Sequence, residues 1–481
     1  MFYKVILFSI ALCLSFPAFN QDFSKSNAVY FRRGLTTSAP VLSDVSNESL
    51  IAKLDQHSFQ LYWKAKDGKY HLVNDKASSK KKINQHFLYY SFDEKPFKDA
   101  DFVLLPSTFK TKFPVQITKK SESEWVLHFI ADNKKVYQSI LKEYNTSKWM
   151  EQFLHTDTSS LTLKDIVFPG SHDAGMSVLT ATGGQQKGTI NACNTLTQLI
   201  SIEEQLQQGI RMFDLRVGAY NKLLYTKHAA SDCMEDAIGG GYGERLKTVA
   251  VGLKKFLEDN KKEVVLISFS HFCEKEAPLS QLQDSLLNWI GAEHIYNNSA
   301  ATIADVPLKL LAGKVILSFE IPGWNNPLFP RCDMTDTSNA FINFRRAYAS
   351  TNDMNKLLQT ELDFFNKLKI GVAKNDLIRL DWQITQSADE ASAICNDFQD
   401  EKLNPIVNGA ILLANMIRKN KSIIDHAKIA NLQLPVKINE WITNKTINHR
   451  NRPNIIYVDV AGTWATDYCV SLLQTPLYQL N

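Results

Sequence analysis

Two histidines, two aspartates and an arginine stand at the ends of three short apolar stretches between residues 165 and 228. The first stretch ends in His172 and Asp173, the second carries Asp214 and Arg216, and the third closes on His228. Two histidines can flank a phosphodiester, one accepting a proton and the other donating one. A planar guanidinium matches two phosphate oxygens. This part of the chain therefore predicts an acid–base site for phosphoryl transfer.

The period of two along a β-strand indicates which of these side chains point together. In the run from Arg211 to Arg216, Asp214 and Arg216 share one face and apolar residues occupy the other. A strand of a barrel places apolar side chains outward against helices and polar ones inward where a site exists. Asp214 and Arg216 are therefore predicted to point into the lumen. Arg211 has the outward parity, so we expect it in a structural ion pair.

The same period places further polar side chains on the inward faces of three later strand candidates. These residues are Ser270, Arg379, Asp381, Tyr457 and Asp459. A lumen with so many charges is hard to explain by packing, because an unpaired buried charge is costly. We predict that Ser270, Arg379, Asp381 and Tyr457 bind substrate. His271 follows Ser270 with the outward parity, and its role stays open between structure and function.

Strands alternate with helical periods after residue 148. Ser201 and Glu204 have the spacing of a capping box, and an apolar period predicts another helix that ends at Asn260. Strand candidates recur at Val264–Ser270, Lys314–Glu320, Leu377–Thr385 and Ile455–Val460. This alternation favours a parallel α/β barrel over residues 148–481, closed or nearly closed, with its site at the carboxyl ends of the strands. An open doubly wound sheet is the alternative, although no G-x-G-x-x-G or Walker loop supports it. The glycine cluster at residues 239–241 is expected to be a mobile loop near the site.

Residues 21–147 have a different pattern. Alternating apolar residues lead to Asp67-Gly68, a hairpin turn signal, and further strand candidates lie at Phe87–Tyr90 and Trp125–Ile130. This pattern predicts a small β-rich, sandwich-like domain that carries no catalytic constellation. Its role is left open by the sequence.

The N-terminus and the cysteines indicate the compartment. Lys4, an apolar run of about a dozen residues and a polar exit predict a secretory signal peptide over residues 1–20. Six of the seven cysteines lie beyond it, so up to three disulfides are expected in an oxidising compartment. Sequons for N-glycosylation occur at Asn47, Asn145, Asn297, Asn420 and Asn444. We expect a secreted or extracellular glycoprotein, or one in the lumen of the secretory–endolysosomal system. A net charge of +4 without a basic stripe argues against nucleic acid as a partner.

The motifs Phe168-Pro-Gly-Ser-His-Asp-Ala-Gly175 and Gly209-Ile-Arg-Met-Phe-Asp-Leu-Arg216, with the strand that ends in His228, resemble the phosphatidylinositol-specific phospholipase C X domain. The resemblance is to the bacterial and X-domain-only branch and covers the chain from about Trp149 onward. It implies a distorted TIM (β/α)8-type barrel. This fold agrees with the alternation of strands and helices.

The resemblance also implies a role for each matching residue. His172 would take the proton from the inositol 2-hydroxyl, and His228 would protonate the departing diacylglycerol oxygen. Asp173 would orient His228, and Asp214 would hold the guanidinium of Arg216 against the phosphate. Asp459, which is matched only by its place on the last strand, would pair with His172.

Metal-independent catalysis is a further expectation. The calcium-dependent branch has an asparagine after the first histidine and acidic residues at both strand positions, whereas this chain has Asp173 and Arg216. An arginine there supplies positive charge and would repel a cation, so no metal and no cofactor are expected. The lysine and arginine with which the bacterial enzymes hold inositol have no counterparts in Ser268-Phe-Ser270 and Val315–Glu320.

The expected substrate is phosphatidylinositol or a glycosylated inositol phospholipid at a membrane surface, with peripheral contact only. The products would be a cyclic inositol phosphate and diacylglycerol. The alternative is a catalytically silent X domain that binds phosphoinositides or a protein. The complete set of His172, Asp173, Arg216 and His228 favours the enzyme. A glycerophosphodiesterase-like barrel would need metal-binding carboxylates after its first strand, and Ser171-His-Asp173 does not supply them.

Overall fold

The computed structural model describes residues 144–185, 187–297, 300–324, 326–334, 340–368, 372–386 and 422–473, with residues 475, 477 and 478. Before residue 144 it describes the backbone of eight strands. The expected signal peptide, Asn47 and Asn420 lie outside the described residues.

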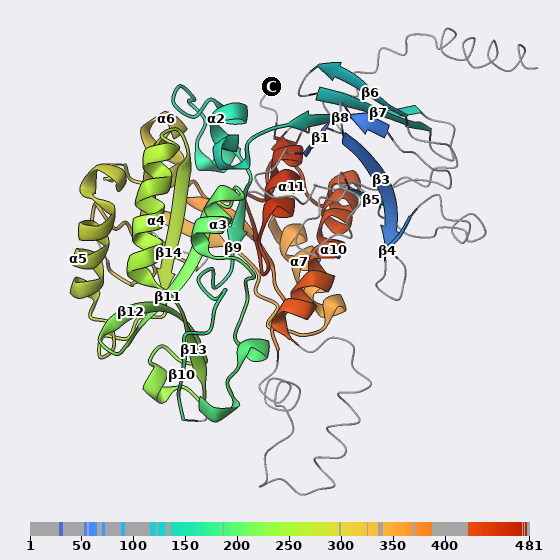
Figure 1. The fold of residues 1–481 in the computed structure, drawn as a ribbon. Coiled ribbons are helices and arrows are strands. Elements are labelled where there is room, and N and C mark those ends of the chain that lie inside the picture. Colours follow the sequence, from blue (N-terminus) through green and yellow to red (C-terminus); the bar gives the residue numbers. More distant parts are fainter. Residues whose placement is uncertain are drawn as a thin grey trace, which may run out of the picture.

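A ring of eight parallel strands forms the centre of the described C-terminal part (Figure 1). In ring order the strands are β9 (Phe168–Ser171), β11 (Met212–Tyr220), β14 (Val264–Ser270), β15 (Lys314–Phe319), β16 (Cys332–Asp333), β17 (Ile342–Arg345), β18 (Asp376–Trp382) and β19 (Ile455–Val458). A parallel bridge between Phe319 and Arg331 joins β15 to the start of β16, and β19 pairs with β9. The predicted α/β barrel is therefore confirmed, and the pairing of β19 with β9 excludes the open sheet.

Helices cover the outside of the ring (Figure 1). They are α2 (Trp149–Leu154), α3 (Ile202–Gln207), α4 (Leu246–Asp259), α5 (Leu279–Ile290), α6 (Leu308–Leu311), α7 (Met354–Lys367), α10 (Ile423–Thr443) and α11 (Thr463–Leu473). Short 3-10 turns occur at η2 (Thr146–Lys148), η3 (Leu163–Asp165), η4 (Lys187–Thr189), η5 (Ala192–Asn194), η6 (Met234–Asp236), η7 (Ala292–His294) and η8 (Ile303–Asp305).

Local sequence explains two of these helices. Ser201 and Glu204 form the predicted capping box of α3, which satisfies backbone donors at its first turn. In α4 the buried side chains recur at helical spacing, and the helix ends before Asn260 as predicted. Among the described residues, no helix has the length and apolar character needed to cross a membrane.

Arg211 directly precedes β11, the second strand of the barrel. Its Nη2 lies 2.6 Å from Oε2 of Glu263, and both side chains are buried. Arg211 also donates to backbone carbonyls, including Leu206 O at 2.9 Å. The predicted structural ion pair is confirmed.

An antiparallel extension stands outside the ring. The last residues of β11 pair with β12 (Leu223–Ala229), β12 pairs with β13 (Gly240–Arg245), and β13 pairs with β10 (Ala181–Gly183). The expectation of a mobile glycine loop at residues 239–241 is wrong, because Gly240 and Gly241 belong to β13. A Cβ on Gly240 would lie 2.6 Å from the carbonyl oxygen of His228, so these glycines allow close packing between strands.

Two four-stranded sheets precede the barrel. One has the order β1 (Ala28–Phe31), β8 (Val136–Glu143), β7 (Glu124–Ile130), β6 (Gln116–Ser121), and the other has β2 (Ala52–Leu54), β3 (His57–Lys64), β4 (Tyr70–Leu72), with β5 (Leu88–Ser91) paired to β3. Strands thus lie in the stretches that the sequence predicts. A separate sandwich-like domain over residues 21–147 stays a prediction.

Three of the cysteines are disulfide-bonded. Cys233 and Cys273 form a disulfide with each other, and Cys193 is also disulfide-bonded, whereas Cys332 and Cys469 are free and buried. Because two of the six thiols are free, at most two disulfides form, which lies within the expected limit of three. Packing places each of these two thiols inside the protein core, away from a partner sulfur.

Candidate active site

His172 follows β9 directly, and the neighbouring strand β19 holds it. Its backbone N–H donates to the carbonyl oxygen of Val458 at 3.0 Å, and its Nδ1 lies 2.7 Å from Oδ1 of Asp459. A carboxylate accepts a hydrogen bond, so Nδ1 carries the proton and Nε2 is the atom left for substrate. The ring also lies edge-on to Tyr457, with 5.4 Å between centroids.

Asp173 is the central carboxylate of the site. Its backbone has a φ of 39°, and its side chain is buried. Oδ2 lies 3.4 Å from Nε2 of His172 and 3.7 Å from Nε2 of His228, and Oδ1 lies 3.3 Å from Nε of Arg216. Burial opposes its ionisation, but Arg216 and the two histidines outweigh this effect and lower the pKa of Asp173 to about 2. Asp173 is therefore an anion between two histidines and a guanidinium.

Arg216 and Asp214 point into the lumen from β11, as the strand period predicts, but they have different partners. The guanidinium of Arg216 lies against Asp173, and its Nη1 donates to the carbonyl oxygen of Ala229 at 3.4 Å. Asp214 instead accepts from the hydroxyl of Tyr457 at 2.7 Å. Among the described residues no ion pair joins Asp214 to Arg216, although burial is outweighed by the charge of Asp173 and, after it, that of Asp214, which raise the pKa of Arg216. That Asp214 holds the guanidinium stays a prediction. Asp173 contacts the guanidinium because the turn after β9 brings its carboxylate over the end of β11.

His228 reaches the site from β12, outside the ring. Its Nδ1 lies 3.0 Å from the carbonyl oxygen of Thr195. A carbonyl can only accept, so Nδ1 is protonated and Nε2, which faces Asp173, exchanges protons with substrate. Nε2 of His172 and Nε2 of His228 both lie near the same oxygen of Asp173, Oδ2. The two Nε2 atoms therefore lie close enough to flank one phosphodiester group.

The charge state of His172 follows from its surroundings. Burial favours the neutral ring, but Asp173 and Asp459 outweigh it and raise the pKa of His172 to about 9. At neutral pH the free protein therefore holds His172 largely as imidazolium. The neutral form, which can accept a proton, grows as the pH rises toward 9.

The residues predicted to bind substrate are all buried; they are Ser270, Arg379, Asp381 and Tyr457. Arg379 holds Asp381 by two hydrogen bonds, of 2.6 Å from Nε and 3.0 Å from Nη2, and its guanidinium lies 4.0 Å from the centroid of the Tyr457 ring. Ser270 pairs in register with Arg216. The structure thus brings these residues into one lumen beside the histidines. Asp381 is held by Arg379 and Arg346, whereas Nη1 of Arg379 is buried without a hydrogen-bond partner.

Sequence reasoning missed three groups at this end of the barrel. Arg346 follows β17, donates to Oδ2 of Asp381 at 3.2 Å, and keeps 27% of its side chain exposed. Glu320 follows β15, and burial raises its pKa, while Arg346 opposes the rise. The carbonyl oxygen of Thr195 holds His228. The alternation in Phe341-Ile-Asn-Phe-Arg345 was a signal for the strand before Arg346, whereas a backbone carbonyl has no sequence signature.

His271 lies beside this site rather than in it. Its Nδ1 is 2.7 Å from Oδ1 of Asp232, and both side chains are largely exposed. Ligand atoms of His172, Asp173 and Asp214 lie within 4.8 Å of one another, which is the spacing of a possible metal site. The guanidinium of Arg216 lies against one of these carboxylates, so this group of ligands already has a cation beside it.

A closed parallel barrel with an acid–base site at its carboxyl ends is the class that fold and site define. No family model matches the chain, and no curated relative matches it. Among solved structures it is similar to a phosphatidylinositol-specific phospholipase C variant from Staphylococcus aureus, with 15% identity over 68% of this chain and 97% of that one, and a TM-score of 0.47. It is similar to the same kind of enzyme from Listeria monocytogenes, with 17% identity over 68% and 98% of the two chains and a TM-score of 0.41. Likeness at this level carries no argument about activity, which we draw from the residues of the site.

Proposed function

We propose that this chain is a secreted phosphodiesterase that cleaves phosphatidylinositol, or a glycosylated inositol phospholipid, to a cyclic inositol phosphate and diacylglycerol. The observation that carries the proposal is the arrangement around Asp173. Two histidines present Nε2 to one carboxylate oxygen, and the guanidinium of Arg216 lies on the other. Each histidine has its Nδ1 held by an acceptor. This is a site built for one proton transfer on each side of a bound phosphate.

The steps follow from this geometry. Nε2 of His172 takes the proton of the inositol 2-hydroxyl, whose oxygen attacks phosphorus. Arg216 binds phosphate oxygens and stabilises charge as the new bond forms. The bond from phosphorus to the diacylglycerol oxygen breaks, and Nε2 of His228 donates its proton to that oxygen. No water is consumed, because the inositol hydroxyl is the nucleophile.

The absence of a metal requirement is part of the proposal. Arg216 stands where a cation would otherwise neutralise the phosphate. Its contact with Asp173 also partly neutralises a carboxylate that a cation would need as a ligand. Because a guanidinium stays protonated, Arg216 can supply the positive charge beside the phosphate without a metal.

The headgroup would lie against β17 and β18. Arg346 is the partly exposed member of the Arg346–Asp381–Arg379 cluster, and its Nε is buried without a hydrogen-bond partner. An unpaired buried donor is costly, so a hydroxyl or phosphate oxygen of a headgroup is a fitting acceptor. Arg346 would then bind the headgroup in place of the lysine and arginine that are missing from Ser268-Phe-Ser270 and Val315–Glu320.

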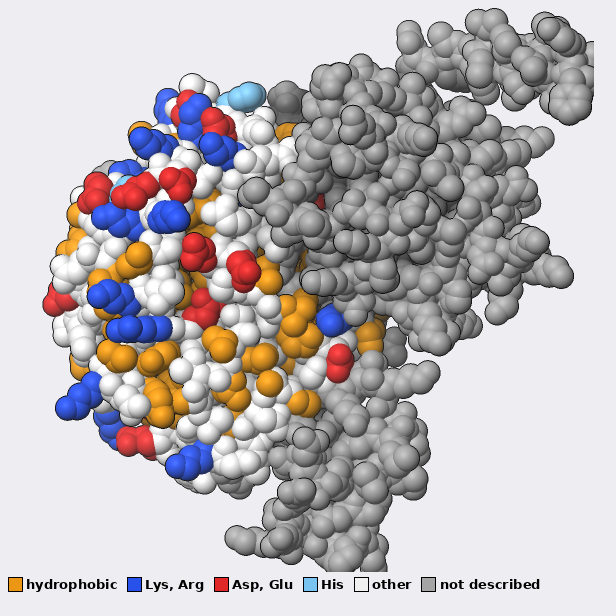
Figure 2. All heavy atoms as spheres, in the orientation of Figure 1, with side chains coloured by type: hydrophobic (Ala, Val, Ile, Leu, Met, Phe, Trp, Pro, Cys, Tyr) orange, Lys and Arg blue, Asp and Glu red, His pale blue; other side chains and the backbone are white. Residues whose placement is uncertain are grey.

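Several features support contact with a lipid surface. Exposed apolar side chains follow the strand ends that carry the site, namely Val178, Ile238 and Tyr348. Figure 2 shows apolar side chains gathered over the part of the described surface where β12 and β13 lie in Figure 1. Apolar side chains beside a site are suited to peripheral contact with lipid.

Secretion is supported by the disulfide. Cys233–Cys273 requires an oxidising compartment to persist. The expected signal peptide and the exposed sequon residues Asn145, Asn297 and Asn444 agree with that compartment. Expression in cells with detection in the medium tests this part: protein that stays in the cytosol would contradict it.

The activity test uses purified full-length protein and phosphatidylinositol vesicles, without and with a chelator. We expect cyclic inositol phosphate in both cases, and its loss on chelation would overturn metal independence. The control is His172→Ala, which we expect to be inactive. If the wild type and this variant are equally inactive on all inositol lipids, the enzyme proposal fails and a binding module remains.

A further inference from the structure

His228 lies on β12, which is not one of the eight strands of the barrel ring. β12 is attached to the ring by pairing with the last residues of β11, from Val217↔Thr226 outward to Tyr220↔Leu223. His228 itself pairs with Gly241 of β13, which is also outside the ring. A catalytic group must be held to a fraction of an ångström to act. The end of β12 therefore needs an anchor beyond its strand pairing.

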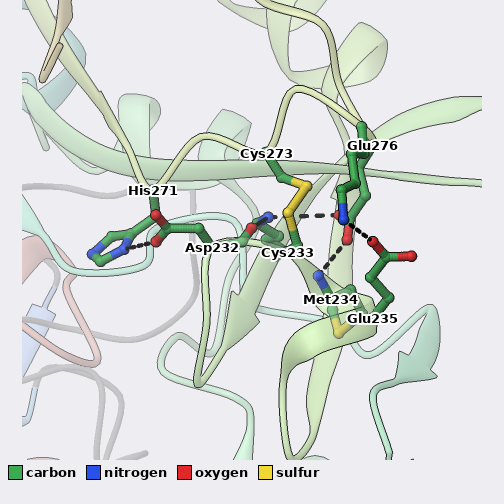
Figure 3. Close-up of a disulfide and its surroundings, with 9 residues drawn as sticks. Asp232, Cys233, Met234, Glu235, His271, Cys273 and Glu276 are labelled. Carbon is green, nitrogen blue, oxygen red and sulfur yellow. Dashed lines mark hydrogen bonds and ion pairs between the residues drawn. A yellow bond between two sulfur atoms is a disulfide. The ribbon is translucent and has the colours of Figure 1, made fainter.

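The loop after β12 is joined to the loop after β14, a strand of the ring (Figure 3). Asp232 pairs with His271 at 2.7 Å, Cys233 is bonded to Cys273, and Glu235 pairs with Lys275 at 2.9 Å. The backbone N–H of Met234 donates to Oε1 of Glu276. We call this set of contacts the loop clamp.

Lys227 extends the loop clamp to the residue beside His228. Consecutive residues of a strand point to opposite faces, so Lys227 points away from the site while His228 points into it. The Lys227 side chain is 0% exposed; its Nζ donates to the carbonyl oxygen of Asp232 and lies 3.6 Å from Oε2 of Glu276. A Cβ on Gly218 would lie 2.9 Å from both Lys227 and Glu276, so β11 packs closely over the pair.

The members of the loop clamp differ in strength. The pairs of Asp232 with His271 and of Glu235 with Lys275 involve side chains that are 48% to 73% exposed. Exposed ion pairs of that kind contribute little to stability. The disulfide is covalent, and removing one partner of a buried ion pair leaves an uncompensated buried charge. Cys233–Cys273 and Lys227–Glu276 are therefore the members that hold the loops together.

We infer that the Cys233–Cys273 disulfide and the Lys227–Glu276 pair position His228 for proton donation, by tying the end of β12 to the end of β14. The inference rests on the proposed function, in which His228 protonates the leaving oxygen. These four residues touch neither substrate nor reacting atoms, so they are positioning residues. Their loss slows the step that needs the proton and spares the rest of the mechanism.

Two substrates separate this role from a general effect on stability. Phosphatidylinositol has an alkoxide leaving group that needs a proton, whereas the para-nitrophenyl ester of inositol phosphate releases a phenolate that leaves without one. Full-length wild type, Cys233→Ser/Cys273→Ser and Glu276→Gln are compared on both. We expect kcat on phosphatidylinositol to fall by about tenfold or more in each variant, with a change below about twofold on the ester.

The control is Leu434→Ala, a buried residue of α10 far along the chain from the loop clamp. It is expected to lower thermal stability without changing the ratio of the two rates. Equal losses on both substrates, or no loss on either, would overturn the inference. If the cysteine variant does not fold, the ratio of the rates of Glu276→Gln on the two substrates tests the inference alone. A wild type that cleaves neither substrate removes the proposed function instead, and the inference falls with it.

Discussion

His172 and Asp459 follow adjacent strands of the barrel, β9 and β19, and their Nδ1 and Oδ1 atoms lie 2.7 Å apart. The carboxylate holds the proton on Nδ1, keeps Nε2 toward Asp173, and stabilises the imidazolium form of the ring. Asp459 therefore fixes the direction of the His172 ring and, together with Asp173, raises its pKa. The basicity of His172 has a direct consequence for the dependence of activity on pH.

The rate should rise with pH in the wild type. His172 must be neutral to accept a proton, and its pKa is raised to about 9, so kcat/KM on the para-nitrophenyl ester of inositol phosphate, whose release needs no proton from His228, should increase up to about that pH. In Asp459→Asn the neighbouring negative charge is lost, the pKa of His172 falls, and the ascending limb should move to lower pH. The maximal rate should also drop by at least about tenfold, because the ring loses its orientation. Identical ascending limbs in the two proteins would show that Asp459 does not govern the titrating base.

The two histidines should respond differently to the leaving group. His172→Ala removes the base and should lower kcat by about 10²- to 10⁴-fold on both phosphatidylinositol and the para-nitrophenyl ester. His228→Ala removes the acid and should cause a loss of that size on phosphatidylinositol alone. Steady-state rates on the two substrates check this, with circular dichroism to show that both variants fold. A reversed pattern would exchange the roles of the two residues.

Arg346→Ala should weaken substrate binding. Arg346 is partly exposed and is proposed to contact the headgroup, so KM should rise by about tenfold while kcat changes little, as expected for a lost hydrogen bond to a charged group. Arg450→Ala removes the same charge from an exposed position after α10 and serves as the control. A fall in kcat at constant KM would assign Arg346 to the chemical step.

Glu244 should make stability depend on pH. It accepts hydrogen bonds from Ser177 Oγ at 2.9 Å and from the backbone N–H of Ile202 at the start of α3, at 3.1 Å. Burial raises its pKa from 4.5 to about 7, with these hydrogen bonds acting in the opposite direction. The folded state therefore binds this proton more tightly than the unfolded state, so stability falls as the pH rises from about 4.5 to 7.

Glu244→Gln should remove that dependence. Relative to the wild type, the free energy of unfolding of the variant should be higher at pH 8 by about 1–3 kcal/mol and nearly unchanged at pH 4. Denaturant titrations at the two pH values measure the difference. A variant that is less stable at pH 8 would show that the ionised carboxylate stabilises α3.

The pattern of residues along each strand is sufficient to predict which faces point into the barrel. The period of two is a local property of backbone geometry, so it placed Asp214 and Arg216 inward, assigned Arg211 to an outward ion pair, and indicated the lumen residues Arg379 and Asp381. The capping box of α3 is equally local. Alternating strands and helices were enough to predict a parallel barrel.

The contacts that each side chain of the site makes follow from the folded structure and not from the residue pattern. The contact of Arg216 with Asp173 instead of Asp214, the carbonyl oxygen of Thr195 that holds His228, and the arrival of Arg346 beside Asp381 all depend on how the ring closes. The same is true of the free thiols and of the loop clamp. Contacts between distant segments are set by the register of neighbouring strands and by packing. Every residue has a backbone carbonyl, so the sequence does not show which carbonyl will accept a hydrogen bond from a side chain of the site. The residue types therefore indicate the chemistry, and the register of the strands selects which of those residues meet.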